Sequence, residues 1–310
     1  MRCKSILGLV VQLALFIALC SALPVQDKVD VDDLVRRAIA NHVQRELIRN
    51  DYTYLAHMRW TDSGYCGRSR PYCTESYEIM FLEGAPYTRH TAHNDQPLSA
   101  DLEKLEEAML QAEAKARRAG AGNKQGSTLG YMMESKSTWT LDHLTTEFSL
   151  RGKGTSVLNG RRVYVVEALP REKPGHLDST VDYPLYFKTT IWIDIEEQQI
   201  VRAKEELIED NLIITQPAIH LRYPLTPEAR QIYESGKSHG TYARGAFFVI
   251  QWTKINGEAW LPQVTHSKFK VWIVHESPAG EMSRRVEFRR KIDTTYSDYQ
   301  KFVVKTRIVP

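Results

Sequence analysis

The sequence predicts an α+β protein built on one large antiparallel sheet with two or three helices. Period-2 alternation of apolar and polar residues recurs through most of the chain, as expected for strands that bury one face. The links between these segments are short, and Asn159-Gly160 and Asn256-Gly257 are typical of tight hairpin turns. Few stretches have helical spacing. Together these observations predict roughly nine to eleven strands, mostly antiparallel.

Residues 1–22 have the features of a secretory signal. Arg2 and Lys4 precede an apolar stretch that ends in a run of small residues. An uncleaved membrane anchor and a lipoprotein processed at Cys20 are the alternatives, but the apolar stretch is shorter than the roughly 20 residues that a membrane span needs. We therefore expect a periplasmic or secreted protein whose mature chain is 23–310.

The charge of the chain gives no reason to expect a nucleic-acid partner. Loss of the signal removes two of the 41 basic residues and none of the 38 acidic ones, so the net charge falls from +3 to +1. A nearly neutral chain does not attract polyanions in general. No later segment is apolar enough to predict a transmembrane span in the mature protein.

Cys66 and Cys73 are the two cysteines that remain after the signal. In an oxidising compartment, two cysteines around a short Gly/Ser/Pro loop favour a disulfide. Closing such a loop stabilises a fold by ~2–3 kcal/mol. A redox or metal pair is the alternative, but the spacing is not CxxC and no further cysteine completes a zinc site. We expect no metal and no cofactor.

Three segments have helical spacing. Residues 30–50 carry a wide apolar stripe, which predicts a helix that lies on a sheet. Ser99 is a candidate N-cap for a charged helix that ends near Ala119. We interpret it as a largely solvent-facing helical insertion around 99–126. Residues 140–148 predict a shorter helix.

Alternation predicts strands with one apolar face and one mostly charged face. Phe269 and Val271, for example, alternate with Lys268 and Lys270. Such strands fit a single curved sheet with a polar convex face and an apolar concave face that helices plug; an ordinary core behind the sheet is the alternative. The predicted strands are 52–60, 77–82, 162–169, 188–195, 200–207, 245–253, 263–276, 285–292 and 301–308.

No catalytic constellation is evident in the sequence, and we expect no enzyme. His90 and His93 have HxxH spacing on an expected loop without an acidic partner nearby, and His239 lies in an expected polar loop. The acid pairs Glu196-Glu197 and Glu205-Glu206 are interpreted as turn and surface charge. A secreted hydrolase remains an alternative if one of these histidines meets a Ser, a Cys or a carboxylate in a polar cleft.

Three stretches of the chain stand out: LEGAPYTR through HNDQPLS (82–99), LNGRRVYVVE (158–167) with the later IWID and IVR, and GEAWLP (257–262) with YSDYQKF (296–302). They resemble secreted proteins of the outer-membrane lipoprotein-sorting type, which have the LolA/LolB-like fold, especially their acidobacterial-type members. The resemblance implies an incomplete antiparallel barrel, closed by helices, around a cavity that receives acyl chains. Residues 23–310 then form one such domain, longer than LolA by the charged helix and the cysteine loop.

The one-sided strands and the resemblance together predict a carrier that holds acyl chains of a lipid or lipoprotein on the concave face. Burial there is worth ~0.8 kcal/mol per methylene, so no catalytic residue is needed. The alternative is a structural or interaction protein of the envelope without a ligand, with a transient protein partner. The residues expected on the concave face are Met58, Ile79, Phe81, Ile191, Ile193, Phe248, Ile250, Phe269, Val271, Ile273, Val286 and Phe288.

Overall fold

The computed structural model describes residues 29–62, 71–120, 141, 143–171, 187–215, 237–276 and 286–302. Apart from residues 29 and 30, all of them belong to the compact unit Val31–Pro310. The predicted signal, Cys66 and the strand expected beyond residue 302 lie outside the described residues. Cys73 is described, and it is buried at the start of a strand. The disulfide between Cys66 and Cys73 therefore stays a prediction.

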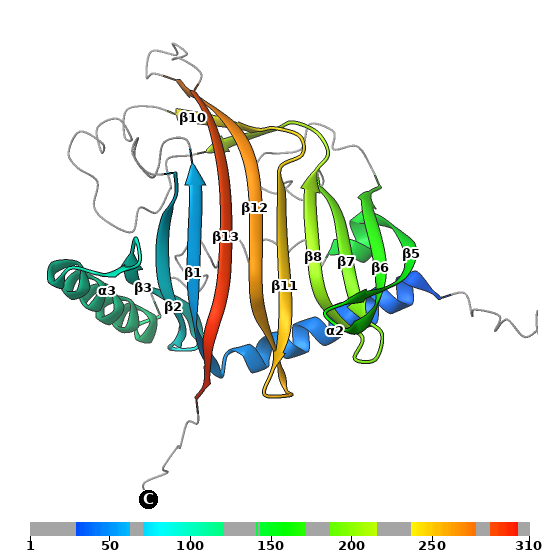
Figure 1. Ribbon diagram of the computed structural model, residues 1–310, viewed down its shortest axis with the longest axis horizontal. Helices are drawn as coiled ribbons and strands as arrows, with labels where there is room; N and C mark the ends of the chain where they lie inside the picture. The colour runs from blue at the N-terminus through cyan, green and yellow to red at the C-terminus, as the bar shows by residue number, and fades with distance from the viewer. Residues whose placement is uncertain are drawn as a thin grey trace, which may run out of the picture. The chain divides into compact units, whose positions relative to one another are not determined.

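The unit is built on one antiparallel sheet, as the sequence predicts (Figure 1). Its main path runs β4-β3-β2-β1-β13-β12-β11-β8-β7-β6-β5, and the outer strands β4 and β5 do not pair in the described structure, so the sheet is not closed. The strands are β1 (Tyr52–Asp62), β2 (Cys73–Leu82), β3 (Ala85–His93), β4 (Gln96–Pro97), β5 (Phe148–Leu158), β6 (Arg161–Pro170), β7 (Phe187–Asp194), β8 (Gln199–Leu207), β9 (Asn211–Thr215), β10 (Lys237–Tyr242), β11 (Phe247–Ile255), β12 (Ala259–Glu276) and β13 (Val286–Lys301).

Tight turns join many of the strands, and their backbones explain the sequence signals. Asn159 and Gly160 have φ values of 50° and 77°, and Asn256 and Gly257 have 52° and 73°. Positive φ at both central positions is what a type I′ hairpin turn requires, and Asn-Gly meets it at low cost. These turns fix the antiparallel pairs β5–β6 and β11–β12.

Helix α2 (Val31–Arg49) packs across one face of the sheet, against β5, β8 and β12 (Figure 1). Leu34, Val35 and Ala38 of its apolar stripe are buried in the largest core cluster. The segment 143–147, also helical as predicted, adds Leu144 to the same cluster. Helices therefore cover part of the apolar face, which was the expected arrangement.

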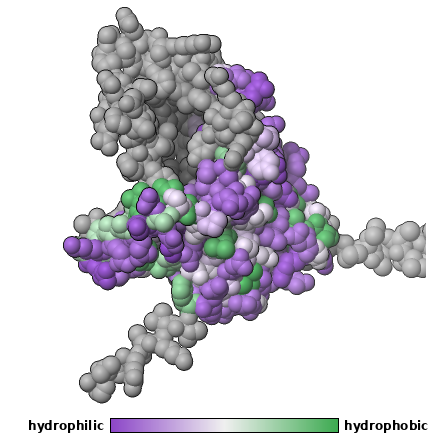
Figure 2. All heavy atoms as spheres, turned by 60° about the vertical axis from the view of Figure 1, so that its left-hand side comes forward, coloured by the Kyte–Doolittle hydropathy of each residue, from purple (hydrophilic) through white to green (hydrophobic). Residues whose placement is uncertain are grey.

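Helix α3 (Ala100–Arg118) packs on β3, near the edge of the sheet. Ser99 is its N-cap, and the Ser99 hydroxyl accepts a hydrogen bond from the Leu102 backbone N–H. On this side of the unit, hydrophilic side chains dominate the described surface (Figure 2). The helix is nevertheless anchored, because the Arg117 guanidinium donates hydrogen bonds to the carbonyls of Leu82, Ala85 and Pro86.

Three expectations about the strands were wrong. His90 and His93 lie in β3 and not in a loop, and His239 lies in β10. β13 continues from Ile292 to Lys301, although its sequence there is polar. Thr294 and Tyr296 of β13 are buried, so the alternation of buried and exposed residues continues through this part of the strand. The pattern was missed because these two buried residues carry hydroxyl groups.

Candidate ligand-binding site

The strand register places the predicted apolar residues on one face of the sheet. Met58 pairs with Thr294, Thr294 with Thr265, and Thr265 with Ile250. Ile250 in turn pairs with Ala203, which pairs with Ile191. Directly paired residues point to the same side of a sheet. Met58, Ile250 and Ile191 therefore share the face on which α2 lies, which we call the inner face.

Under α2, the inner face is filled by the side chains of the protein. Ile191, Ile193 and Ile250 are at most 1% exposed, and they belong to the cluster that contains Leu34 and Val35 of α2. Phe248 is half-buried at the margin of this cluster. A ligand reaches these positions only if α2 moves aside.

Nearer the β2 edge, two further clusters continue the inner face. Ile79 packs with Tyr52 and Tyr54, and Phe81 lies half-buried near the end of the same strand. Met58 packs with Trp60 and Ile292. Phe269 is half-buried against that second group. Val271 and Ile273 follow in β12, where they pair with Phe288 and Val286 of β13.

The partner strand of β12 is interrupted next to Phe269. β12 pairs with β11 as far as Lys268 and with β10 from Val271 onward. Between β10 and β11, the link Ala243–Ala246 bends toward the end of β8, where the Gly245 N–H donates to the Leu207 carbonyl at 2.8 Å. Gly245 has a φ of 82°, which favours glycine. The bend leaves space beside β12.

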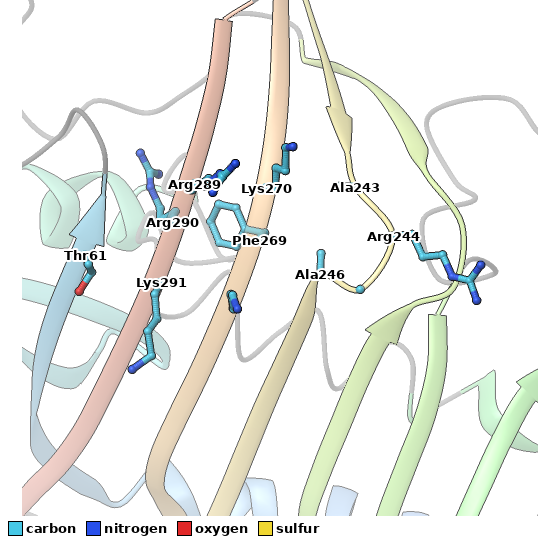
Figure 3. A pocket seen from close by; sticks show the side chains of 11 residues that line it. Thr61, Ala243, Arg244, Ala246, Phe269, Lys270, Arg289, Arg290 and Lys291 are labelled. Atoms are coloured by element: carbon cyan, nitrogen blue, oxygen red, sulfur yellow. The ribbon is translucent and has the colours of Figure 1, made fainter.

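That space is a hollow of about 600 Å³ (Figure 3). Phe269 is the predicted ligand-binding residue that lines the hollow. Thr61 and the link Ala243–Ala246, which were not predicted, also line it. Sequence reasoning missed the basic part of the lining, because charged positions were assigned to the solvent face. Six cations surround the hollow: Arg244, Lys268, Lys270, Arg289, Arg290 and Lys291.

Acidic residues neutralise part of this charge. The Glu287 carboxylate accepts hydrogen bonds from Lys270 Nζ and Arg289 Nε, each at 2.9 Å, and these bonds lower the pKa of Glu287 to about 2. Lys291 Nζ donates to Asp293 at 2.7 Å. Burial opposes ionisation of Asp293, but the hydrogen bonds from Lys291 and His266 outweigh it and lower the pKa of Asp293.

Phe269, which lines the hollow, lies close to two further aromatic rings and to Arg290. Arg290 pairs with Phe269 in the register, and its guanidinium carbon lies 5.2 Å from the Trp60 ring centre and 5.9 Å from that of Phe269. The Tyr242 ring lies 5.7 Å from Phe269. Burial raises the pKa of Tyr242, and the positive charge of Arg290 opposes that rise. A cation and apolar surface therefore meet here.

His90 and His93 do have an acidic partner, contrary to the prediction. The Glu75 carboxylate contacts His90 Nε2 at 2.6 Å and His93 Nδ1 at 2.8 Å. Glu106 of α3 accepts a hydrogen bond from the His90 backbone N–H, and Glu75 and His90 are buried. The group thus ties α3 to β2 and β3. Among the described residues, no three His, Cys, Asp or Glu side chains are placed to hold a metal ion.

A second polar group brings Ser, His and Asp together on the outer face. His57 Nδ1 lies 3.0 Å from Ser76 Oγ, and His57 Nε2 lies 3.7 Å from Asp95. In a catalytic triad, the aspartate holds Nδ1 and the serine faces Nε2, which is the reverse of this arrangement. His57 and Asp95 are also exposed. The geometry therefore does not match nucleophilic catalysis.

Glu197 and Glu205 are not the surface charges expected from the sequence. Glu205 is buried in β8. Glu197, in the turn between β7 and β8, accepts hydrogen bonds from Arg45, Arg161 and Lys254. Burial opposes its ionisation, but hydrogen bonds from Lys254, Trp260 and Arg161 prevail and lower the pKa of Glu197 to about 2. The turn sequence alone gave no sign of these distant partners.

No family model and no curated protein matches this chain. Solved structures do match, over 89% of the chain. One is an outer membrane lipoprotein-sorting protein domain from Vibrio parahaemolyticus, with 10% identity, a TM-score of 0.31 and 95% of that chain covered. Another is the LolA superfamily protein NE2245 from Nitrosomonas europaea, with 8% identity, a TM-score of 0.31 and 95% covered.

A third match comes from the Pseudomonas aeruginosa MucA/MucB complex, at 9 to 10% identity, with a TM-score of 0.25 to 0.26 and the whole of that chain covered. Within the described residues of our chain, no helix is both long enough and apolar enough to cross a bilayer.

Proposed function

We propose that the protein is an exported, non-catalytic binding protein that holds an acyl chain of a lipid or lipoprotein beside Phe269. The observation that carries this proposal is that Phe269 belongs to the apolar inner face and also lines the hollow. Apolar surface and open volume adjoin at this residue. The hollow of about 600 Å³ has the size of small-molecule sites, which span roughly 300 to 1,000 Å³.

Two apolar clusters meet at Phe269 and support the acyl chain in this proposal. Met58, Trp60 and Ile292 form one cluster, and Phe187 and Leu207 belong to the other. A chain laid along this surface gains ~0.8 kcal/mol for each methylene it buries. Beyond Phe269, we assign the continuation of the site to Val271, Ile273, Val286 and Phe288, which the register pairs along β12 and β13.

Four of the predicted ligand-binding residues have a structural role in this proposal: Ile191, Ile193, Phe248 and Ile250. They form the packed part of the inner face, together with α2. Their contribution is to hold the sheet and the helix together, so that the surface around Phe269 keeps its shape.

The test combines native mass spectrometry with a fluorescent fatty acid. The chain is expressed with its own first 22 residues, purified after export under non-reducing conditions, and titrated with 11-(dansylamino)undecanoic acid. We expect a bound lipid mass, dansyl fluorescence that rises on binding, and at least tenfold weaker binding in Phe269→Glu. Val157→Glu is the matched control, because Val157 is 68% exposed on β5.

The outcomes separate the candidate functions. Binding that is equally strong in Phe269→Glu, with its fold retained, would place the ligand elsewhere. A protein without lipid that also fails to bind the probe would contradict the proposal and favour the envelope interaction protein. Lack of export, or a protein that keeps residues 1–22, would contradict the periplasmic assignment.

A further inference from the structure

We propose that the hollow binds the phosphate group of an anionic amphiphile, whose apolar part lies against Phe269. This inference rests on the proposed function and adds to it the charge of the headgroup. It starts from a feature that acyl-chain binding does not require, namely the six cations around the hollow.

Cations outnumber acids around the hollow in the described part of the chain. Glu287 and Asp293 pair with Lys270, Arg289 and Lys291. A third acid, Asp210, accepts a hydrogen bond from the Arg244 backbone N–H at 2.7 Å, so these three acids stand beside the six cations that line the hollow. Arg244 and Lys268 are exposed, and their side chains form no ion pair with the part of the chain that the structure describes.

Like charges also lie opposite one another in β12 and β13, and Glu287 and Asp293 offset part of their repulsion. Lys268 lies directly opposite Lys291 in the β12–β13 register, and Lys270 lies directly opposite Arg289. Like charges at directly paired positions destabilise a sheet. An anion bound in the hollow, beside these pairs, would reduce that repulsion, since a cleft lined by one sign of charge concentrates the opposite ion.

A phosphate group fits the number and type of these cations. A phosphate monoester carries about −1.5 to −2 charges at pH 7 and offers three acceptor oxygens. Arginine binds such groups with two parallel hydrogen bonds, and lysine binds them as a point charge. Arg244 from the link, Lys268 from β12 and Lys291 from β13 line the hollow from three segments of the chain.

The apolar part of the ligand lies on Phe269 in this proposal. Phe269 and Arg290 are paired on the inner face, whereas Lys268 and Lys270 alternate with Phe269 along β12. All four residues line the hollow, where the partner strand is interrupted. An amphiphile can therefore set its phosphate among the lysines and its chain on Phe269.

Calorimetric titrations of the full mature protein test the inference with three probes: octyl phosphate, neutral octyl β-glucoside and inorganic phosphate. We expect octyl phosphate to bind at least tenfold more tightly than the other two. We also expect its affinity to fall as sodium chloride rises from about 50 to 500 mM, because salt screens exposed charges. In the double variant Arg244→Gln, Lys268→Gln, we expect at least tenfold weaker binding of octyl phosphate.

The control variant Lys104→Gln, Lys115→Gln removes the same charge from exposed positions on α3 and should bind as the wild type does. Equal binding of octyl phosphate and octyl glucoside would overturn the inference and leave the proposed function standing. Binding of neither would overturn both. Inorganic phosphate that binds as tightly as octyl phosphate would assign the hollow to free phosphate and overturn the amphiphile.

Discussion

Glu197 Oε2 accepts a hydrogen bond from Trp260 Nε1 at 3.2 Å and so connects the β7–β8 turn to β12. Lys254 Nζ donates to both carboxylate oxygens at 3.0 Å, and Arg45 of α2 donates at 3.2 Å. One carboxylate thus joins the helix and three strands at the end of the inner face.

Stability should depend on the ionised form of Glu197. Its pKa of about 2 lies below the ordinary value of 4.5. The stabilisation is therefore complete above pH 4.5 and is lost as the pH falls toward 2. Glu197→Gln should lower the free energy of unfolding at pH 7 by about 1–3 kcal/mol and flatten its acid dependence. Urea unfolding at pH 7, 4.5 and 3 measures both effects, and an unchanged pH profile would contradict the role of Glu197.

Glu196→Gln is the matched control for that experiment. Glu196 precedes Glu197 in the same turn, and its side chain is exposed. We expect this neighbouring variant to unfold within about 0.5 kcal/mol of the wild type, as is usual for surface substitutions.

Ile193 should act as a core residue. It is fully buried in the cluster that α2 covers. Ile193→Ala should therefore lower the free energy of unfolding by about 2–5 kcal/mol, through lost burial and a residual cavity. Val157→Ala, at an exposed position, should change it by less than about 0.5 kcal/mol. Wild-type stability of Ile193→Ala in thermal unfolding would instead favour a position that only a ligand covers.

Gly245 should be required for the shape of the link beside the hollow. Nothing lies within 4 Å of a Cβ added there, so the cost of Gly245→Ala is the strain of its positive φ. We expect a loss of about 1 kcal/mol for Gly245→Ala and a smaller loss for Gly245→Asn, because asparagine tolerates positive φ better. Denaturant unfolding compares the two variants, and the opposite order would contradict this explanation.

Arg117 should hold α3 on the sheet. Its three hydrogen bonds to carbonyls between Leu82 and Pro86 are 2.7 to 3.0 Å long, and its Nε donates to Glu113 at 2.6 Å. Arg117→Ala leaves these acceptors without that donor, and it should cost about 2–4 kcal/mol. Hydrogen exchange of α3 should accelerate in this variant. Arg118→Ala, at an exposed neighbour, should leave exchange unchanged.

Local signals predicted much of the fold. Three features could be recognised directly because each depends on residues that are close in sequence. They are the apolar stripe of α2, the Ser99 N-cap and the two Asn-Gly turns. Period-2 alternation found most of the strands for the same reason. β3 was missed because its buried side chains include polar ones such as Thr88 and His90.

The candidate site could be predicted only in part. Phe269 was found from alternation on its own strand. The hollow also depends on the interruption between β10 and β11, which brings Arg244 beside β12. These segments are distant in sequence from one another, so no local sequence pattern predicts their contact. The contacts of Glu75 with His90 and His93 likewise join two strands, and they become visible only when the register is known.

The position of β13 between β1 and β12 has a consequence for the folding of the chain. β1–β4 and β5–β8 are each contiguous in sequence, but in the main path of the sheet they are connected only through β11, β12 and β13, which come last. Pairing of Tyr52 with Lys301 spans most of the chain, and such distant contacts form slowly. The edge of β8 stays open to other chains until β11 pairs with it, and the edge of β1 stays open until β13 does. The C-terminal third therefore determines how long the protein is at risk of aggregation.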